Sequence, residues 1–234
     1  TGHTAQLFAV QKKSSEVLEL ARSLETDLNS LVGCTAYLTP PRSQGISPHH
    51  DDVEVFILQT EGSKTWQLFP PVKPLAHKYE KVPPEALSAP VMEVTVEQGD
   101  LLYLPRGFVH QAQATSEFST HLTVSTFQAH AYGDLLEGML APALAKAMDQ
   151  DEEFRRGLPL RAFLRLGSAQ HHAGLESDLR AHVTKHISSL LPKLAEHMDL
   201  AEGVDRMAYE FMKRRLPCKP VKTETEEEEE EEEE

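Results

Sequence analysis

The chain has 234 residues, of which 40% are hydrophobic, and a formal net charge of -14. This hydrophobic fraction suffices for a buried core and excludes a chain that is disordered throughout. Ten of the acidic residues are Glu224 and the glutamates of residues 226–234, so the rest of the chain, at -14 plus ten, carries only -4. The acidity therefore belongs to the end of the sequence, and the remainder has the charge of an ordinary globular surface.

Residues 218–234 are predicted to form a disordered acidic tail, because a run of like charges repels itself and buries no apolar area. The tail is either solubilising or a docking segment for basic partners such as histones or ribosomal proteins. Cys34 and Cys218 lack the spacing of a disulfide framework or metal site, which is typical of a reducing compartment. We find no apolar run of membrane-spanning length and no direct nucleic-acid motif. Because the sequence starts at Thr1 rather than Met, we expect it to be a fragment.

Residues 1–32 are predicted to be an N-terminal segment that contains an amphipathic helix. Ser14 or Ser15 is available as its N-cap. Apolar side chains recur at intervals of three and four along this helix, at Val17, Leu20, Ala21, Leu24, Leu28 and Leu31.

Residues 33–131 are predicted to be a β-barrel core, because short runs of β-branched and aromatic residues alternate with proline and glycine. The candidate strands are residues 36–39, 53–59, 64–69, 91–96, 101–104 and 121–127. Short strands at this spacing, without helices between them, are typical of a sandwich or barrel.

Residues 132–217 are predicted to be helical. The expected helices are residues 134–148, capped by Asp134 and interrupted or kinked at Pro142, then 159–166, 175–191 and 204–216. Their apolar residues exceed what one helix would bury alone, for example Leu135, Leu136, Met139, Leu140, Ile187, Leu190, Leu191 and Leu194. These helices either pack on the chain's own barrel or pair two chains, and we favour the homodimer. The basic residues 213–215 either close the last helix or form part of a nuclear import signal.

Residues 47–56 contain the pattern His-x-Asp twice, as His49 with Asp51 and as His50 with Asp52. Side chains two residues apart on a strand point to the same face. The odd positions continue without a charge as Val53, Val55 and Ile57, whereas the even positions continue as Glu54, Phe56 and Leu58. A metal inside a barrel has apolar residues behind it, so His49 and Asp51 are the favoured pair, and the even register stays open.

A third metal ligand is predicted at His110. In the segment before it, Gly99-Asp100 makes a turn, an apolar strand follows, and Pro105 and Gly107 bend the chain. Two imidazoles and one carboxylate on one face of Fe(II) leave the opposite face open for a bidentate co-substrate and dioxygen. The pattern therefore predicts a non-haem iron site.

The two blocks resemble the metal-binding motifs of the cupin superfamily, in the version carried by JmjC-type oxygenases. Residues 37–45, 49–62, 100–111 and 153–159 further resemble the ribosomal oxygenases, which are nuclear and nucleolar JmjC proteins that hydroxylate histidines of ribosomal proteins. The resemblance covers most of residues 30–215. It implies a mainly β plus α fold, namely a double-stranded β-helix (the cupin or JmjC jelly roll) followed by a helical dimerisation region. It also implies the metal set His49, Asp51 and His110.

The resemblance further implies the co-substrates 2-oxoglutarate and O2 and the residues that contact them. Lys64 corresponds to the family's lysine for the far carboxylate of 2-oxoglutarate, and Tyr37 to a tyrosine that lines the co-substrate and substrate pocket. Thr35 stands where the family usually has Asn, so a hydroxyl replaces an amide. Ser125 matches a position that faces substrate. The family's first motif usually reads His-Tyr-Asp-Asp, so His50 is a departure that adds an imidazole near the metal.

The predicted activity is Fe(II)- and 2-oxoglutarate-dependent hydroxylation of a histidine side chain in a ribosomal protein, in the nucleus (nucleolus or nucleoplasm). The same chemistry on an N-methyl group would make the chain a histone lysine demethylase. A third hypothesis is a non-catalytic scaffold, because the family's extra N-terminal strands and C-terminal winged helix have no counterpart in these residues. A zinc- or manganese-dependent cupin isomerase fits Asp51 with Lys64 less well.

Overall fold

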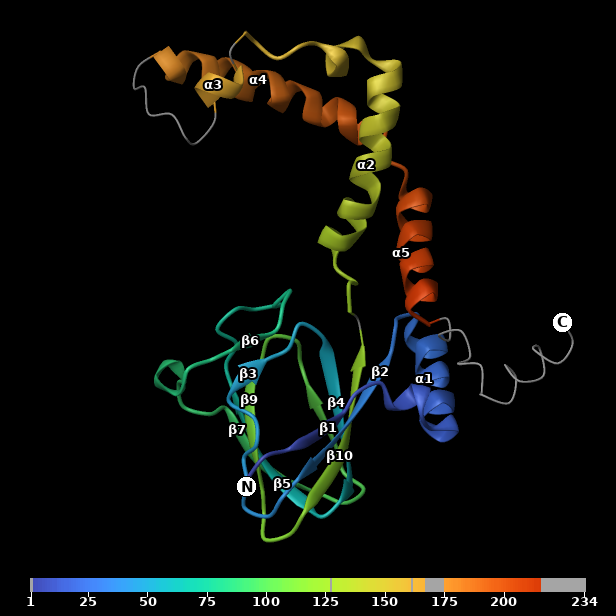
Figure 1. Ribbon diagram of the computed structural model, residues 1–234, viewed down its shortest axis with the longest axis vertical. Coiled ribbons are helices and arrows are strands. Elements are labelled where there is room, and N and C mark those ends of the chain that lie inside the picture. The colour runs from blue at the N-terminus through green and yellow to red at the C-terminus, as the bar shows by residue number, and fades with distance from the viewer. Residues whose placement is uncertain (1, 127, 161, 167–174, 216–234) are drawn as a thin grey trace, which may run out of the picture. The chain divides into compact units, whose positions relative to one another are not determined.

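The computed structural model describes residues 2–126, 128–160, 162–166 and 175–215. The predicted acidic tail and Cys218 lie outside these described residues. The chain divides into two compact units, residues 1–130 and the chain from Ala131 onward. The first unit is a β-domain with one helix, and the described part of the second is helical (Figure 1).

The β-domain consists of two five-stranded antiparallel sheets that form a jelly-roll sandwich, which confirms the predicted fold class (Figure 1). The first sheet has the order β1-β2-β10-β4-β8, with the bounds Ala5–Leu7, Gly33–Thr39, Ser119–Thr126, Glu54–Glu61 and Leu101–Leu104. The second has the order β6-β3-β9-β5-β7, with the bounds Glu80–Lys81, His49–His50, Val109–Ala114, Ser63–Phe69 and Met92–Glu97. The sequence predicts six of the described strands and misses β1, β3, β6 and β9.

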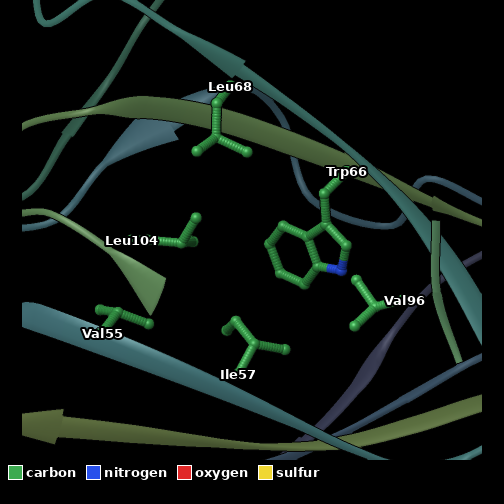
Figure 2. Close-up of a cluster of buried hydrophobic side chains, with 6 residues drawn as sticks. All are labelled: Val55, Ile57, Trp66, Leu68, Val96 and Leu104. Carbon is green, nitrogen blue, oxygen red and sulfur yellow. The ribbon is translucent and has the colours of Figure 1, made fainter. Parts of the chain in front are cut away.

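A buried apolar core lies between the two sheets, because alternate side chains of each strand point inward. Figure 2 shows three residues of the first sheet opposite three of the second: Val55, Ile57 and Leu104 face Trp66, Leu68 and Val96. All six are at most 5% exposed. In β4 the inward positions are odd-numbered, and in β5 they are even-numbered.

Helix α1 (Ser15–Leu28) covers the outer face of the first sheet. Its N-cap is Ser14, whose Oγ accepts a hydrogen bond of 3.3 Å from the Val17 N–H, as the sequence predicts. Ala21 of α1 is fully buried and packs in a cluster with Cys34 of β2 and Val124 of β10. The 3-10 turn η1 (Val10–Lys12) contributes Val10 to the same cluster. Even-numbered residues of β2 and β10 therefore face the helix, and odd-numbered ones are left to face the interior.

The helical unit contains α2 (Tyr132–Gln150), η3 (Glu152–Arg155), α3 (Ala162–Leu166), α4 (Leu175–Glu196) and α5 (Leu200–Arg215). A second 3-10 turn of the β-domain, η2, spans Pro84–Ala86. The predicted cap at Asp134 is wrong: α2 begins two residues earlier, and Asp134 accepts a 2.7 Å hydrogen bond from the Ala131 N–H within the first turn. Pro142 lies inside α2. None of the described helices has the length and apolarity that crossing a membrane requires.

Candidate metal centre and adjoining cavity

His49, Asp51 and His110 come together where β3 pairs with β9. His49 lies directly opposite His110 in this antiparallel pair, so both imidazoles point to the same face, with ring centroids 4.3 Å apart. Asp51 follows β3, and its Oδ2 lies 3.6 Å from His110 Nε2. One ligand atom from each residue lies within 4.8 Å of the others. Bonds of about 2.0–2.2 Å to one ion hold two ligand atoms up to about 4.4 Å apart, so the three are close to the spacing of a single-metal site.

Backbone carbonyls fix the tautomer of both histidines. His49 Nδ1 lies 2.8 Å from Ser47 O, and His110 Nδ1 lies 3.1 Å from Phe108 O. A ring that donates from Nδ1 carries its lone pair on Nε2, the atom that a metal would bind. Burial, and then the nearby His49, lowers the pKa of His110 to about 3, so this imidazole stays neutral. Burial raises the pKa of Asp51, and a bound cation would favour its charged form.

The predicted bend before His110 ties the two motifs together. The Phe108 N–H donates to Pro105 O at 3.1 Å, and the Gly107 N–H donates to Asp51 O at 3.1 Å. Gly107 has a φ of +88°, and a Cβ there would lie 2.9 Å from Lys73 O, so the turn requires glycine. The bend therefore joins the end of β3 to the start of β9.

His50 faces away from the cluster. It is 2% exposed, and its Nε2 lies 3.9 Å from Oε2 of Glu80, the residue opposite it in β6. It does not line the cavity, whereas the odd-numbered residues do: His49, Asp51, Val53, Val55 and Ile57. The assumption that residues 49–57 form one strand is wrong, because β3 and β4 belong to different sheets. The odd-numbered residues nevertheless face the cavity in both strands, because β3 and β4 lie in two sheets that enclose the same interior.

A cavity of about 370 Å³ lies between the sheets, and the metal cluster and Lys64 both line it. This volume is within the range of small-molecule sites. Lys64 is 3% exposed, and its Nζ donates to Thr39 Oγ1 at 3.0 Å. Burial lowers the pKa of Lys64 to about 8, so the amine is mostly protonated at neutral pH. Among the described residues no carboxylate lies within ion-pair distance of this buried cation.

The other predicted site residues, Tyr37, Thr35 and Ser125, also line the cavity. Tyr37 and Thr35 lie on β2, and Ser125 lies on the adjacent β10, where its Oγ donates to Gly33 O at 3.4 Å. Burial, and then the charge of Asp51, raises the pKa of Tyr37 to about 12. Its phenol therefore stays protonated and can donate a hydrogen bond.

His121 and Trp66 also line the cavity, and neither is among the site residues predicted from the sequence. His121 of β10 lies directly opposite Tyr37, and the two rings stack with centroids 4.9 Å apart. Trp66 belongs to the core and also lines the cavity. The available signal for His121 is its odd position on a strand whose Ser125 is predicted to face substrate.

Comparison with known proteins gives one matching family and several relatives. The profile of the JmjC domain family matches residues 6–135. Ribosomal oxygenase 1 of Homo sapiens is 38% identical over 228 residues, which are 95% of this chain and 35% of that protein. Ribosomal oxygenase 2 of Mus musculus is 37% identical, over 92% of this chain and 44% of that protein.

A third relative is the bifunctional lysine-specific demethylase and histidyl-hydroxylase NO66 of Drosophila yakuba, 41% identical over 80% of this chain and 28% of that protein. The chain thus spans less than half the length of these relatives. Among solved structures, the X-ray structure of E. coli ycfD has a TM-score of 0.53 at 20% identity, over 80% of this chain and 48% of that one. This likeness supports the fold alone.

Proposed function

The chain belongs to the JmjC domain family, whose profile matches more than half of its residues, and we propose that it is an Fe(II)- and 2-oxoglutarate-dependent protein hydroxylase. The observation that carries the proposal is that His49, Asp51, His110 and the unpaired cation of Lys64 line one cavity. A dicarboxylate with a chelating 2-oxo acid at one end needs a metal and a cation in the same enclosure.

Each residue has a distinct role in this proposal. The Nε2 atoms of His49 and His110 and the carboxylate of Asp51 would hold Fe(II), and Lys64 would pair with the far carboxylate of 2-oxoglutarate. Tyr37 and Thr35 contact the co-substrate, and Tyr37 and Ser125 contact substrate at the same cavity wall. When bound, Fe(II) with 2-oxoglutarate and O2 supplies the oxidation, in which one oxygen atom enters a C–H bond and the other enters succinate as CO2 leaves.

The proposed substrate is a histidine side chain of a ribosomal protein, in the nucleus (nucleolus or nucleoplasm). Two relatives carry the name ribosomal oxygenase, and a third is named a histidyl-hydroxylase. The second candidate is histone lysine demethylation, because the relative of 41% identity is also named a lysine-specific demethylase. Microscopy of the tagged protein tests the location, and exclusion from the nucleus would contradict it.

Anaerobic titration of the purified chain with Fe(II) and then 2-oxoglutarate tests the activity class. We expect a visible charge-transfer band from the chelated 2-oxo acid. With O2, mass spectrometry of reacted peptides then separates the candidates: a histidine-containing ribosomal-protein peptide gains one oxygen, whereas a methylated histone peptide would lose a methyl group. Iron binding without the band would contradict the oxygenase, and no iron binding would favour the scaffold.

A homodimer through α2 is part of the proposal. Leu135 and Met139 lie against Gly203 of α5, and Lys146 forms a 2.9 Å ion pair with Glu202. A second stripe of α2, at intervals of four residues, is exposed along the described helix: Tyr132, Leu136, Leu140, Leu144 and Met148 are 43–88% exposed. Such a stripe is typical of a helix that packs on another chain.

Replacing Leu140 and Leu144 together by aspartate is expected to convert a dimer to a monomer, because the change buries two charges in the interface. Light scattering at micromolar concentration measures the mass. Ala141→Asp and Ala145→Asp, which lie one residue beyond the stripe, serve as the matched control. A monomeric wild-type chain would contradict the dimer.

A further inference from the structure

His121 is a buried histidine that the proposed reaction does not yet use. It is 2% exposed and lines the cavity from β10. Its ring stacks on Tyr37 with an interplanar angle of 5° and meets the ring of Trp66 edge-on, with centroids 5.5 Å apart. The position of the imidazole is therefore fixed from two sides.

Packing alone does not explain an imidazole at this position. His121 Nδ1 is buried and has no hydrogen-bond partner in the part of the chain that the structure describes. A buried polar atom without a partner costs stability, and a phenyl ring would make the same stacking contacts without that cost. Neither ring nitrogen bonds to the described protein, and the ring lines the cavity, so its N–H is available to a ligand bound there.

The surroundings of His121 specify the chemistry of that ligand. Burial, and then the positive charge of Lys64, lowers the pKa of His121 to about 3, so the imidazole is neutral and shares its electrostatic environment with the lysine. Lys64 donates to the Thr39 hydroxyl and has no acidic partner among the described residues. A cation and a neutral N–H donor in one enclosure suit a carboxylate, which accepts on both oxygens.

We propose that His121 is a positioning residue that donates a hydrogen bond to the far carboxylate of the 2-oxo acid, beside Lys64. The inference rests on the proposed function, because it takes 2-oxoglutarate as the ligand. Lys64 supplies the opposite charge, and the stacked imidazole donates a hydrogen bond in a fixed direction. Both contacts need a second carboxylate, so the site selects a dicarboxylic over a monocarboxylic 2-oxo acid. The N–H of the imidazole then has a partner only in the loaded enzyme.

The test compares wild type with His121→Phe, which keeps the stacking ring and removes the donor. Fe(II)-loaded proteins are titrated anaerobically with 2-oxoglutarate by the charge-transfer band, and we expect the Kd of the variant to rise about tenfold to a hundredfold. Calorimetry with oxalate, which chelates the metal and has no far carboxylate, should give the same affinity in both proteins. His121→Asn, which keeps a donor, should recover part of the loss. Thr123→Val, two residues along the same strand face, is the matched control.

Unchanged affinity of His121→Phe for 2-oxoglutarate would overturn the proposal. So would equal weakening of 2-oxoglutarate and oxalate together with a lower Tm, which would make the ring a packing residue. If wild type gives no charge-transfer band, the proposed function fails, and glutarate then decides the inference separately. Glutarate has both carboxylates without the 2-oxo group, and ligand-observed NMR should show its binding to wild type and its loss in His121→Phe.

Discussion

Replacing His49 by alanine will remove Fe(II) binding, whereas the same change at its neighbour His50 will leave it intact. His49 lies opposite His110 in the strand pair, and its Nδ1 contact with Ser47 O leaves Nε2 free for metal. His50 points toward Glu80 and does not line the cavity. Mutation of a residue that only orients a metal ligand lowers metal affinity by about 10- to 100-fold. Removal of a ligand itself should therefore lower the affinity for Fe(II) by more than about 100-fold. Equilibrium dialysis with metal analysis measures it.

Asp51→Ala and Asp52→Ala provide the second matched pair, because each of these adjacent residues is the carboxylate of one of the two His-x-Asp patterns. Asp51 lines the cavity, and Asp52 does not. His50→Ala removes a buried ring, so circular dichroism must show that each variant is folded at the temperature of the dialysis. If His50→Ala and Asp52→Ala lose Fe(II) binding while His49→Ala and Asp51→Ala retain it, the metal ligands belong to the even register.

The sequence predicts strands whose own residues have a clear β pattern, and it misses short strands that depend on pairing with neighbouring strands. β5 alternates Trp66 and Leu68 with Thr65 and Gln67, and β4 contains the β-branched and aromatic run of residues 55–58, so local pattern suffices. β3 and β6 have only two residues each and exist as strands because His49 and His50 pair with Lys81 and Glu80. β9 contains Ala112 and Ala114, which have low strand propensity, and it is held between β3 and β5.

The site shows the same division between local and long-range information. A two-residue period favours His49 with Asp51, and a recognisable bend precedes His110, so local patterns single out these three residues. The family resemblance decides between the two registers. His121 could not be found in this way, because a lone histidine between threonine and leucine carries no motif. Its role depends on the register that sets it opposite Tyr37 and on the burial of Lys64 from another sheet. Such pairings join residues far apart in the chain.

Replacing Lys64 by methionine will stabilise the metal-free protein and abolish tight binding of 2-oxoglutarate. Burial lowers the pKa of Lys64 from 10.5 to about 8, which corresponds to roughly 3 kcal/mol against the charged amine in the folded state at pH 7. The folded chain releases this proton near pH 8, and the unfolded chain retains it until about pH 10.5. Wild-type stability should therefore rise with pH across that window, and the advantage of Lys64→Met should shrink there.

Urea unfolding at pH 7 and at pH 10 measures the stability change, with Lys78→Met as control. Lys78 is 61% exposed and pairs with Glu80, so its replacement should change the free energy of unfolding by no more than about 0.5 kcal/mol. The charge-transfer titration measures the functional cost. Removing one partner of a buried ion pair costs about 3–5 kcal/mol, so the Kd for 2-oxoglutarate should rise at least about 100-fold.

Lys64→Met should raise the stability of the empty protein and lower its affinity for 2-oxoglutarate. Both effects have one cause, because the buried charge destabilises the empty protein and stabilises the bound carboxylate. A carboxylate that enters the cavity turns an unpaired cation into an ion pair, so 2-oxoglutarate should stabilise wild type and leave Lys64→Met unchanged. A variant that keeps wild-type affinity would mean that another group holds the far carboxylate. A variant that is less stable than wild type at pH 7 would mean that the Thr39 hydroxyl and the Trp66 ring already offset the burial of the amine.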